Sequence, residues 1–160
     1  MLVHTQGIVL HAIKYGDTSL ITRIYTRQQG LQSFLVKGVR SQKGSIRPSH
    51  LMPLNLLELV YAQRQNKQLH TLKELKCDPV LFEVHAHPVK RGIALFISEL
   101  LNRCIREEES NAGLFDFLSG SIQILDLHQD HLGLFPHHFC LQLSRYLGFF
   151  PDLNYTENAC

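Results

Sequence analysis

The chain has 160 residues, a length that suits one domain or two small ones. Hydrophobic residues make up 44% of the sequence, which is enough for a real core. No apolar run approaches the roughly 18 residues that a membrane span needs. The first residues also lack the basic stretch and long apolar run of a secretory signal. We therefore expect a soluble, cytoplasmic protein.

The charge is distributed unevenly along the chain, although the net charge is only +2. Residues 1–80 carry eleven Lys or Arg against four Asp or Glu, a balance of +7, whereas residues 81–160 have a balance of −5. This asymmetry predicts two units with different partners. A basic half favours nucleic acid, because neutralised phosphates release counterions. The alternative is that the charges only solvate two surfaces.

The first half has the two-residue period of β-strands. Apolar and β-branched residues recur in five segments, 2–15, 18–26, 31–37, 51–63 and 69–76. Turn residues separate them at 15–17, 28–30 and 65–67. Pro53 suggests a strand start or an edge position in the fourth segment. Five short strands with no helical pattern between them predict a small closed barrel in residues 1–78.

After Asp78-Pro79 the apolar period changes from two to 3.6, which predicts an all-helical unit in residues 79–160. Pro88 suits the first turn of one helix, and Asn111 suits the N-cap of a second. Pro136 is expected to open a third helix, which Gly148 would end.

The segment 38–49, GVRSQKGSIRPS, contains three basic residues and no acid. Its glycines, serines and proline predict a mobile loop. Cations on such an arm can follow a phosphodiester backbone while bases stack on nearby aromatic rings. A solvated loop that only aids solubility is the alternative. The predicted nucleic-acid contacts are Lys37, Arg40, Lys43 and Arg47, extended by Arg23 and Tyr25 on one strand face and by Lys14 at the preceding turn.

Signatures of catalysis and metal binding are missing from the sequence. There is no Walker loop, no GxSxG and no GxGxxG, so we predict no catalytic residues, no enzymatic activity and no cofactor. The ten histidines form no HExxH pattern, and the cysteines have no zinc spacing, so no metal site is predicted. Leu132–Phe135 and Phe149-Phe150 suggest an apolar pocket. Beside Arg103, Arg106 or Arg145 it would suit an acidic peptide with an aromatic end.

Several segments, in order and spacing, resemble the RecO family of bacterial recombination mediators. They include 5–10 (TQGIVL), 15–21 (YGDTSLI), 36–40 (VKGVR) and 147–153 (LGFFPDL). The resemblance implies an N-terminal OB-fold domain and a C-terminal helical domain. It implies a protein that binds single-stranded and double-stranded DNA and anneals strands without ATP. It also implies recombinase loading, with RecR, on DNA covered by single-stranded-DNA-binding protein. By the family's pattern, Lys37 and Arg40 contact DNA.

The sequence departs from the family pattern in two places. Many relatives have a cysteine three positions after the LGxxPxL element, whereas this chain has Thr156, so zinc is not expected. Relatives also run longer, so we expect the helical unit to be C-terminally incomplete. An alternative function is a protein-interaction module whose barrel docks a protein partner instead of DNA.

Overall fold

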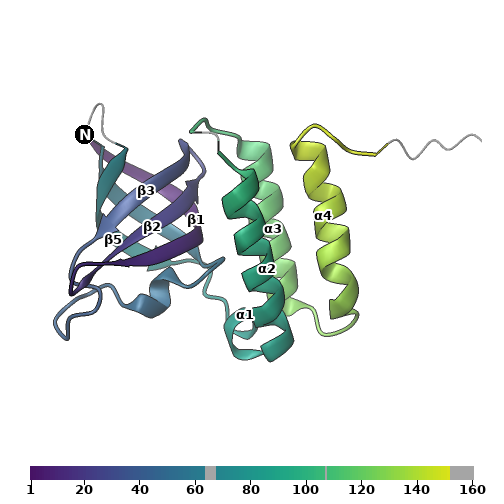
Figure 1. Cartoon of the computed structure of the whole chain (residues 1–160), viewed down its shortest axis with the longest axis horizontal. Coiled ribbons are helices and arrows are strands. Elements are labelled where there is room, and N and C mark those ends of the chain that lie inside the picture. The colour runs from purple at the N-terminus through teal and green to yellow at the C-terminus, as the bar shows by residue number, and fades with distance from the viewer. Residues whose placement is uncertain (64–67, 107, 152–160) are drawn as a thin grey trace, which may run out of the picture.

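A computed structural model of the chain describes residues 1–63, 68–106 and 108–151. Its N-terminal half is a closed barrel with the strand order β1-β2-β3-β5-β4 (Figure 1). β3 and β5 pair in parallel, and the other neighbouring strands are antiparallel. This arrangement confirms the predicted five-stranded OB-type barrel. The strands are β1 (Leu2–Tyr15), β2 (Ser19–Thr26), β3 (Gly30–Val36), β4 (Leu56–Ala62) and β5 (Leu69–Cys77).

The predicted fourth strand, 51–63, begins too early. The 3-10 helix η1 (Pro48–Leu51) precedes it, and Leu54 has a left-handed φ of 66°. Because Pro53 lacks an N–H and Leu54 bends the chain, pairing starts only at Leu56. The turn predicted at 65–67 lies outside the described residues, as do Thr156 and Cys160.

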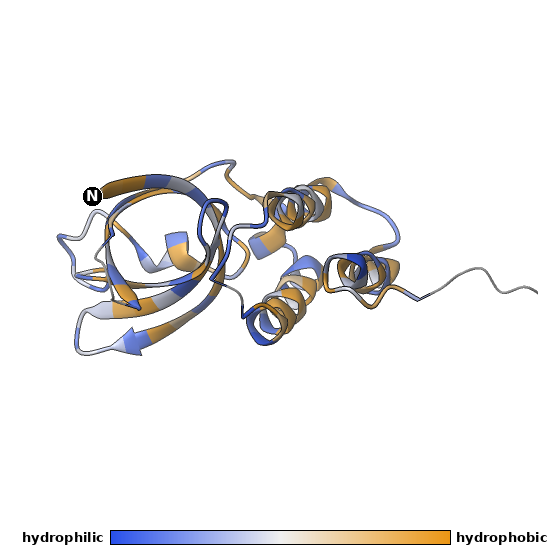
Figure 2. Cartoon of the chain, turned by 90° about the horizontal axis from the view of Figure 1, so that it is seen from above, coloured by the Kyte–Doolittle hydropathy of each residue, from blue (hydrophilic) through white to orange (hydrophobic). Residues whose placement is uncertain are grey.

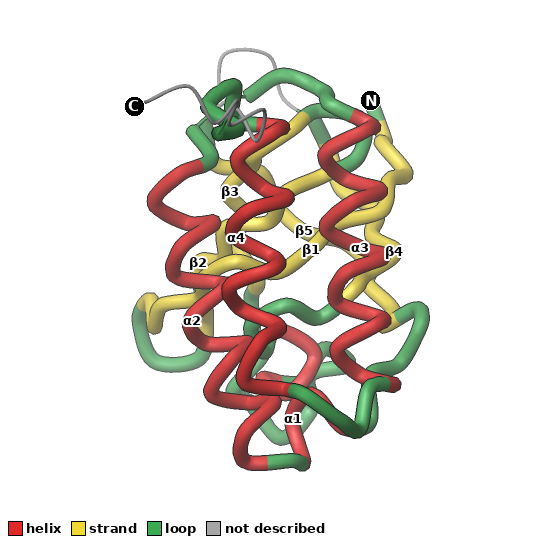
Figure 3. Tube along the Cα trace, turned by 90° about the vertical axis from the view of Figure 1, so that its right-hand side faces the viewer, coloured by secondary structure: helices red, strands yellow, loops and turns green. Residues whose placement is uncertain are grey.

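The C-terminal half is helical, as predicted, and forms a layer on one side of the barrel (Figures 1 and 3). Asn111 caps the second long helix, since its Oδ1 accepts a hydrogen bond from the N–H of Leu114 at 2.9 Å. Pro88 and Pro136 lie in first turns, and Gly148 has a φ of +82° after the last helix. The helices are α1 (Glu83–Ala86), α2 (Pro88–Cys104), α3 (Ala112–Leu127), the 3-10 turn η2 (Leu132–Leu134) and α4 (Phe135–Tyr146).

Two apolar clusters hold the molecule together. The first fills the barrel and includes Ile24, Phe34 and Tyr61. The second joins the outer wall of the barrel to the helices, of which α2 and α3 face the barrel and α4 lies on their far side (Figures 1 and 2). β1 and β2 are thus buried on both faces over part of their length. Members of the second cluster include Ile8, Leu10, Tyr25 and Leu31 from the barrel and Ile97, Leu101, Phe115 and Leu118 from the helices.

Asp126 ties the start of the helical layer together. It lies near the end of α3 and is buried, and its carboxylate accepts hydrogen bonds from the N–H groups of Phe82, Glu83 and Val84 at 2.8–3.3 Å. The buried Lys90 of α2 donates from Nζ to the backbone oxygen of Asp126 at 2.7 Å. One residue therefore fixes α1 and α2 against α3.

We predict that Asp126→Ala destabilises the protein by about 3 kcal/mol, because three donors lose their charged acceptor. The measurement is the free energy of unfolding in urea. Asp130→Ala, at an exposed position beyond the same helix, is the matched control and should change the free energy by less than about 0.5 kcal/mol. Equal effects of the two substitutions would contradict this role of Asp126.

His70 is buried inside the barrel, where its ring centre lies 6.0 Å from that of Phe34 and 5.3 Å from that of Tyr61. Its Nε2 lies 3.1 Å from Oε1 of Gln32, and its Nδ1 has no hydrogen-bond partner among the described residues. Burial lowers the pKa of His70 below 6.5, and the charge of Glu108 opposes this shift less strongly. The folded barrel therefore favours the neutral ring.

We predict that the free energy of unfolding falls as the pH is lowered through 6.5. The unfolded chain takes up a proton there before the folded chain does, so stability present above pH 6.5 is lost below it. His70→Gln keeps a polar side chain for Gln32 but cannot titrate, so the fall between pH 7 and 5 should be smaller in this variant. Burial also lowers the pKa of His85, so His85 would contribute to the pH dependence that remains in this variant. An unchanged slope in His70→Gln would refute the assignment.

Candidate nucleic-acid interface

Basic side chains gather at one end of the barrel. Lys14 pairs with Leu20, which pairs with Val36, so the strand ends meet in one row. The N–H of Arg40 donates to the backbone oxygen of Thr18 at 3.0 Å and brings the loop after β3 to the same place. In the described part of the chain, no carboxylate oxygen lies within 4.0 Å of these cations. We name as the basic end the exposed residues Lys14, Lys37, Arg40, Lys43 and Arg47.

The loop that carries four of these cations is anchored to the barrel at Val39, and the predicted mobility of its other residues stays a prediction. Val39 is buried and belongs to the core of the barrel. Ser41 donates from Oγ to the oxygen of Gly38 at 2.8 Å. A Cβ on Gly44 would lie only 2.3 Å from the same oxygen, so only glycine fits there. The buried Val39 leaves Lys37 and Arg40 exposed on either side of it.

Arg23 and Tyr25 share one face of β2, as predicted, but the helices cover that face. Tyr25 is 1% exposed, and its ring stacks on that of Phe115 with centroids 6.3 Å apart. Arg23 is half-buried and donates from Nη1 to Oδ1 of Asn102 on α2 at 2.7 Å. The prediction that bases stack on Tyr25 is therefore wrong, and Arg23 braces the barrel against α2. The alternation of residues along β2 correctly predicted that Arg23 and Tyr25 share a face, but it could not show that the helices cover this face.

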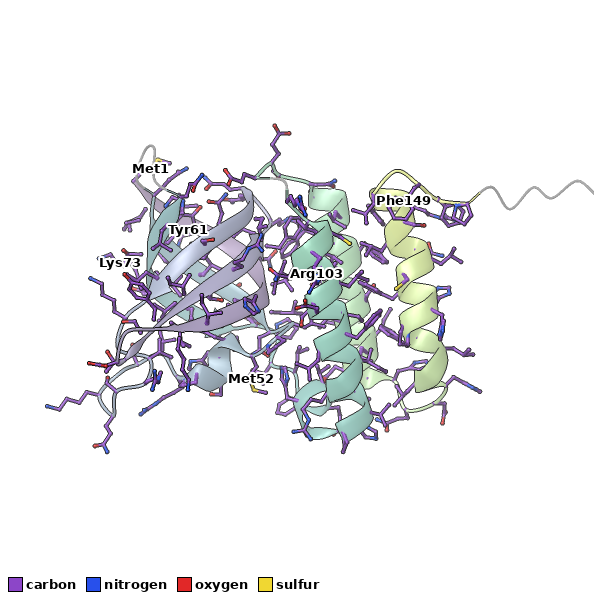
Figure 4. All side chains as sticks on the ribbon, in the orientation of Figure 1. Met1, Met52, Tyr61, Lys73, Arg103 and Phe149 are labelled. Atoms are coloured by element: carbon purple, nitrogen blue, oxygen red, sulfur yellow. The ribbon has the colours of Figure 1, made fainter. Side chains whose placement is uncertain are left out.

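Two further residues lie at this end: Tyr15, a weaker candidate that the sequence places at the turn with Lys14, and Lys73, which the sequence pattern does not place there. Tyr15 is 54% exposed beside Lys14 and is an aromatic side chain available to solvent there. Leu35 pairs in parallel with Thr71, so Lys73, two residues further along β5, lies level with Lys37, which directly follows β3. Lys73 projects from the barrel side away from the helices (Figure 4). The position of Lys73 at this end follows from the parallel pairing of β3 with β5, which the sequence pattern does not reveal.

An apolar groove of about 430 Å³ lies between α2 and α4. Phe149 lines it, as predicted, together with Phe96, Pro136 and Leu141, whereas the segment Leu132–Phe135, also predicted to line it, does not. The guanidinium of Arg145 lies 4.1 Å from the ring centre of Phe150. An acidic peptide as the occupant of this groove remains a prediction.

No cluster of three or more His, Cys, Asp or Glu side chains suited to a metal ion occurs within residues 1–63, 68–106 and 108–151. The helices in those ranges include none with both the length and the hydropathy of a membrane span.

The fold is that of OB-type barrel proteins with an added helical layer, and OB barrels include many proteins that bind single-stranded nucleic acid. Two family models match the chain. Recombination protein O N terminal covers residues 1–78, and Recombination protein O C terminal covers residues 86–158. The chain belongs to the RecO family.

Relatives named DNA repair protein RecO resemble nearly the whole chain. The protein of Christiangramia forsetii is 41% identical over 98% of this chain and 66% of its own length. That of Bacteroides fragilis is 42% identical over 96% of this chain and 64% of its own length. That of Phocaeicola vulgatus is 38% identical over 100% of this chain and 66% of its own length. The chain thus spans slightly less than two thirds of these relatives.

Tyr25 and Tyr15 offer a matched test of burial. We predict that Tyr25→Ala lowers the free energy of unfolding by about 3–4 kcal/mol, because it leaves a cavity between the barrel and Phe115. Tyr15→Ala should cost less than about 0.5 kcal/mol, because that ring is exposed. Urea unfolding of both variants measures the difference. Similar values would mean that Tyr25 is not part of the shared core.

Proposed function

We propose that this chain is a DNA repair and recombination mediator that holds single-stranded DNA on the basic end of its barrel. The observation that supports the proposal is the gathering of five exposed cations at one end of an OB-type barrel, none of which has a carboxylate partner among the residues that the structure describes. Unpaired surface cations repel one another and hold counterions, and both effects favour binding of a polyanion.

Binding on this surface is electrostatic and independent of sequence. Lys37, Arg40, Lys43 and Arg47 neutralise phosphates, and Tyr15 offers a ring on which a base can stack. Double-stranded DNA carries the same phosphates and binds by the same contacts. Two strands held by one cationic surface repel each other less, so complementary strands anneal without ATP and without a catalytic residue.

The partners proposed for the whole protein are RecR and single-stranded-DNA-binding protein. With RecR it would load the recombinase on DNA that single-stranded-DNA-binding protein covers. The apolar groove between α2 and α4, on the acidic half of the chain, is remote in sequence from the basic loop and leaves room for a protein contact while DNA is held. This work on DNA belongs in the bacterial cytoplasm, at the nucleoid.

Reversing the charge of Lys37, Arg40, Lys43 and Arg47 to Glu tests the proposal. We expect the affinity for a fluorescently labelled single strand to fall at least about a hundredfold at low salt, because four phosphate contacts become repulsive. Single changes to Gln should each weaken binding and reduce the salt slope by about one. Fluorescence anisotropy at increasing salt measures both quantities.

The matched control is the reversal of Arg106 and Arg145, which are exposed on the helical half and lie outside the basic end. It should leave single-strand binding within about threefold of the parent. If both reversals were equally harmful, only net charge would matter and the basic end would not be the binding surface. If the parent bound no DNA while a protein partner bound unaffected by the reversal, the barrel would instead be a protein-docking module.

A further inference from the structure

A second groove adjoins the basic end. It lies between the end of β1, the segment around η1 and one face of α2, and its volume is about 410 Å³. Its floor is apolar and consists of the buried side chains of Leu10, Leu20 and Leu51. The volume falls within the roughly 300–1,000 Å³ typical of small-molecule sites.

The walls of this groove are apolar and open to solvent. Leu95 of α2 is 54% exposed, and Met52 on the opposite side is half-buried. Figure 4 shows Met52 at the gap between the barrel and α2. Ser98, also in the lining, already donates from Oγ to the oxygen of Leu95 at 3.0 Å. The groove thus offers contact area and few free hydrogen-bonding groups.

One cation lines the groove, and two more lie close to lining residues along the chain. Lys14 of the basic end is part of the lining, and Arg47 directly precedes Pro48, another lining residue. Arg91 lies one helical turn before Leu95 on α2 and is exposed. The acidic residue in the lining is Glu99, and its Oε1 lies 2.7 Å from Nε of Arg103. The surroundings therefore suit an apolar group that is attached to an anionic chain.

We propose that this groove receives an unstacked nucleobase of the single strand whose phosphates lie on the basic end. The inference rests on the proposed function and deepens it. A base offers flat, weakly polar faces to the apolar walls, while its phosphate stays outside near Lys14 and Arg47. Because Tyr25 is buried, the groove provides the base contact that β2 does not. The few free polar groups in it predict little preference among bases.

The test compares two labelled strands of equal length, oligothymidylate and an abasic strand with the same phosphates, in binding to the full chain. We expect oligothymidylate to bind about tenfold more tightly. Leu95→Gln and Met52→Gln, which are neutral, should each reduce this preference to about twofold while the salt slope stays unchanged. Leu127→Gln, at a position that is 77% exposed on α3 and outside the groove lining, is the matched control and should keep the preference.

The outcomes separate this inference from the proposed function. Equal, salt-dependent binding of both strands by the parent would overturn the groove and leave the basic end intact. Absence of binding by either strand would overturn both. In a second measurement, photo-crosslinking of a strand that carries 5-iododeoxyuridine should label the peptide containing Met52. Label confined to peptides outside the groove would also overturn it.

Discussion

The outer wall of β1 and β2 determines how the rest of the molecule is arranged. Ile8, Leu10 and Tyr25 face away from the barrel interior, and the helices must cover them to keep them from water. Burying each such side chain stabilises the fold by about 1.5–3 kcal/mol. Because the helices occupy this wall, they remove part of the sheet surface on which OB barrels commonly bind ligands. A ligand must approach at the end of the barrel or on the strands that stay uncovered.

The loop of the basic end is anchored to the barrel although its charges repel one another. Val39, inserted in the core, offsets that repulsion with buried apolar area. The backbone of Gly44 lies close to that of Gly38 and brings the two sides of the loop together. Lys37 therefore lies on one side and Arg47 on the other. A folded loop loses less conformational entropy on binding than a mobile one, so more of the electrostatic gain remains as affinity.

Sequence patterns predicted the helices and strands well, but they did not predict which of their faces are buried by other elements. Strand alternation, the Asn111 cap and the prolines of the helices are local signals, and the structure confirms them. The burial of Tyr25 depends on Phe115, ninety residues away, and no local pattern records that contact. Lys73 depends in the same way on the parallel pairing of β3 with β5. The resemblance to RecO proteins indicated the family but not which matched side chains are exposed.

The helical layer supports the basic end from behind. His85 of α1 places its Nε2 2.8 Å from Oδ1 of Asn55, and Nδ2 of Asn55 donates to the backbone oxygens of Ser49 and His50 at 2.9 and 3.0 Å. That chain of hydrogen bonds holds the segment that follows Arg47 and leads to Met52. Deleting the helices would remove this support and expose the apolar wall of the barrel at the same time. The barrel and the helices therefore build the interface together, and the barrel supplies the five cations of the basic end.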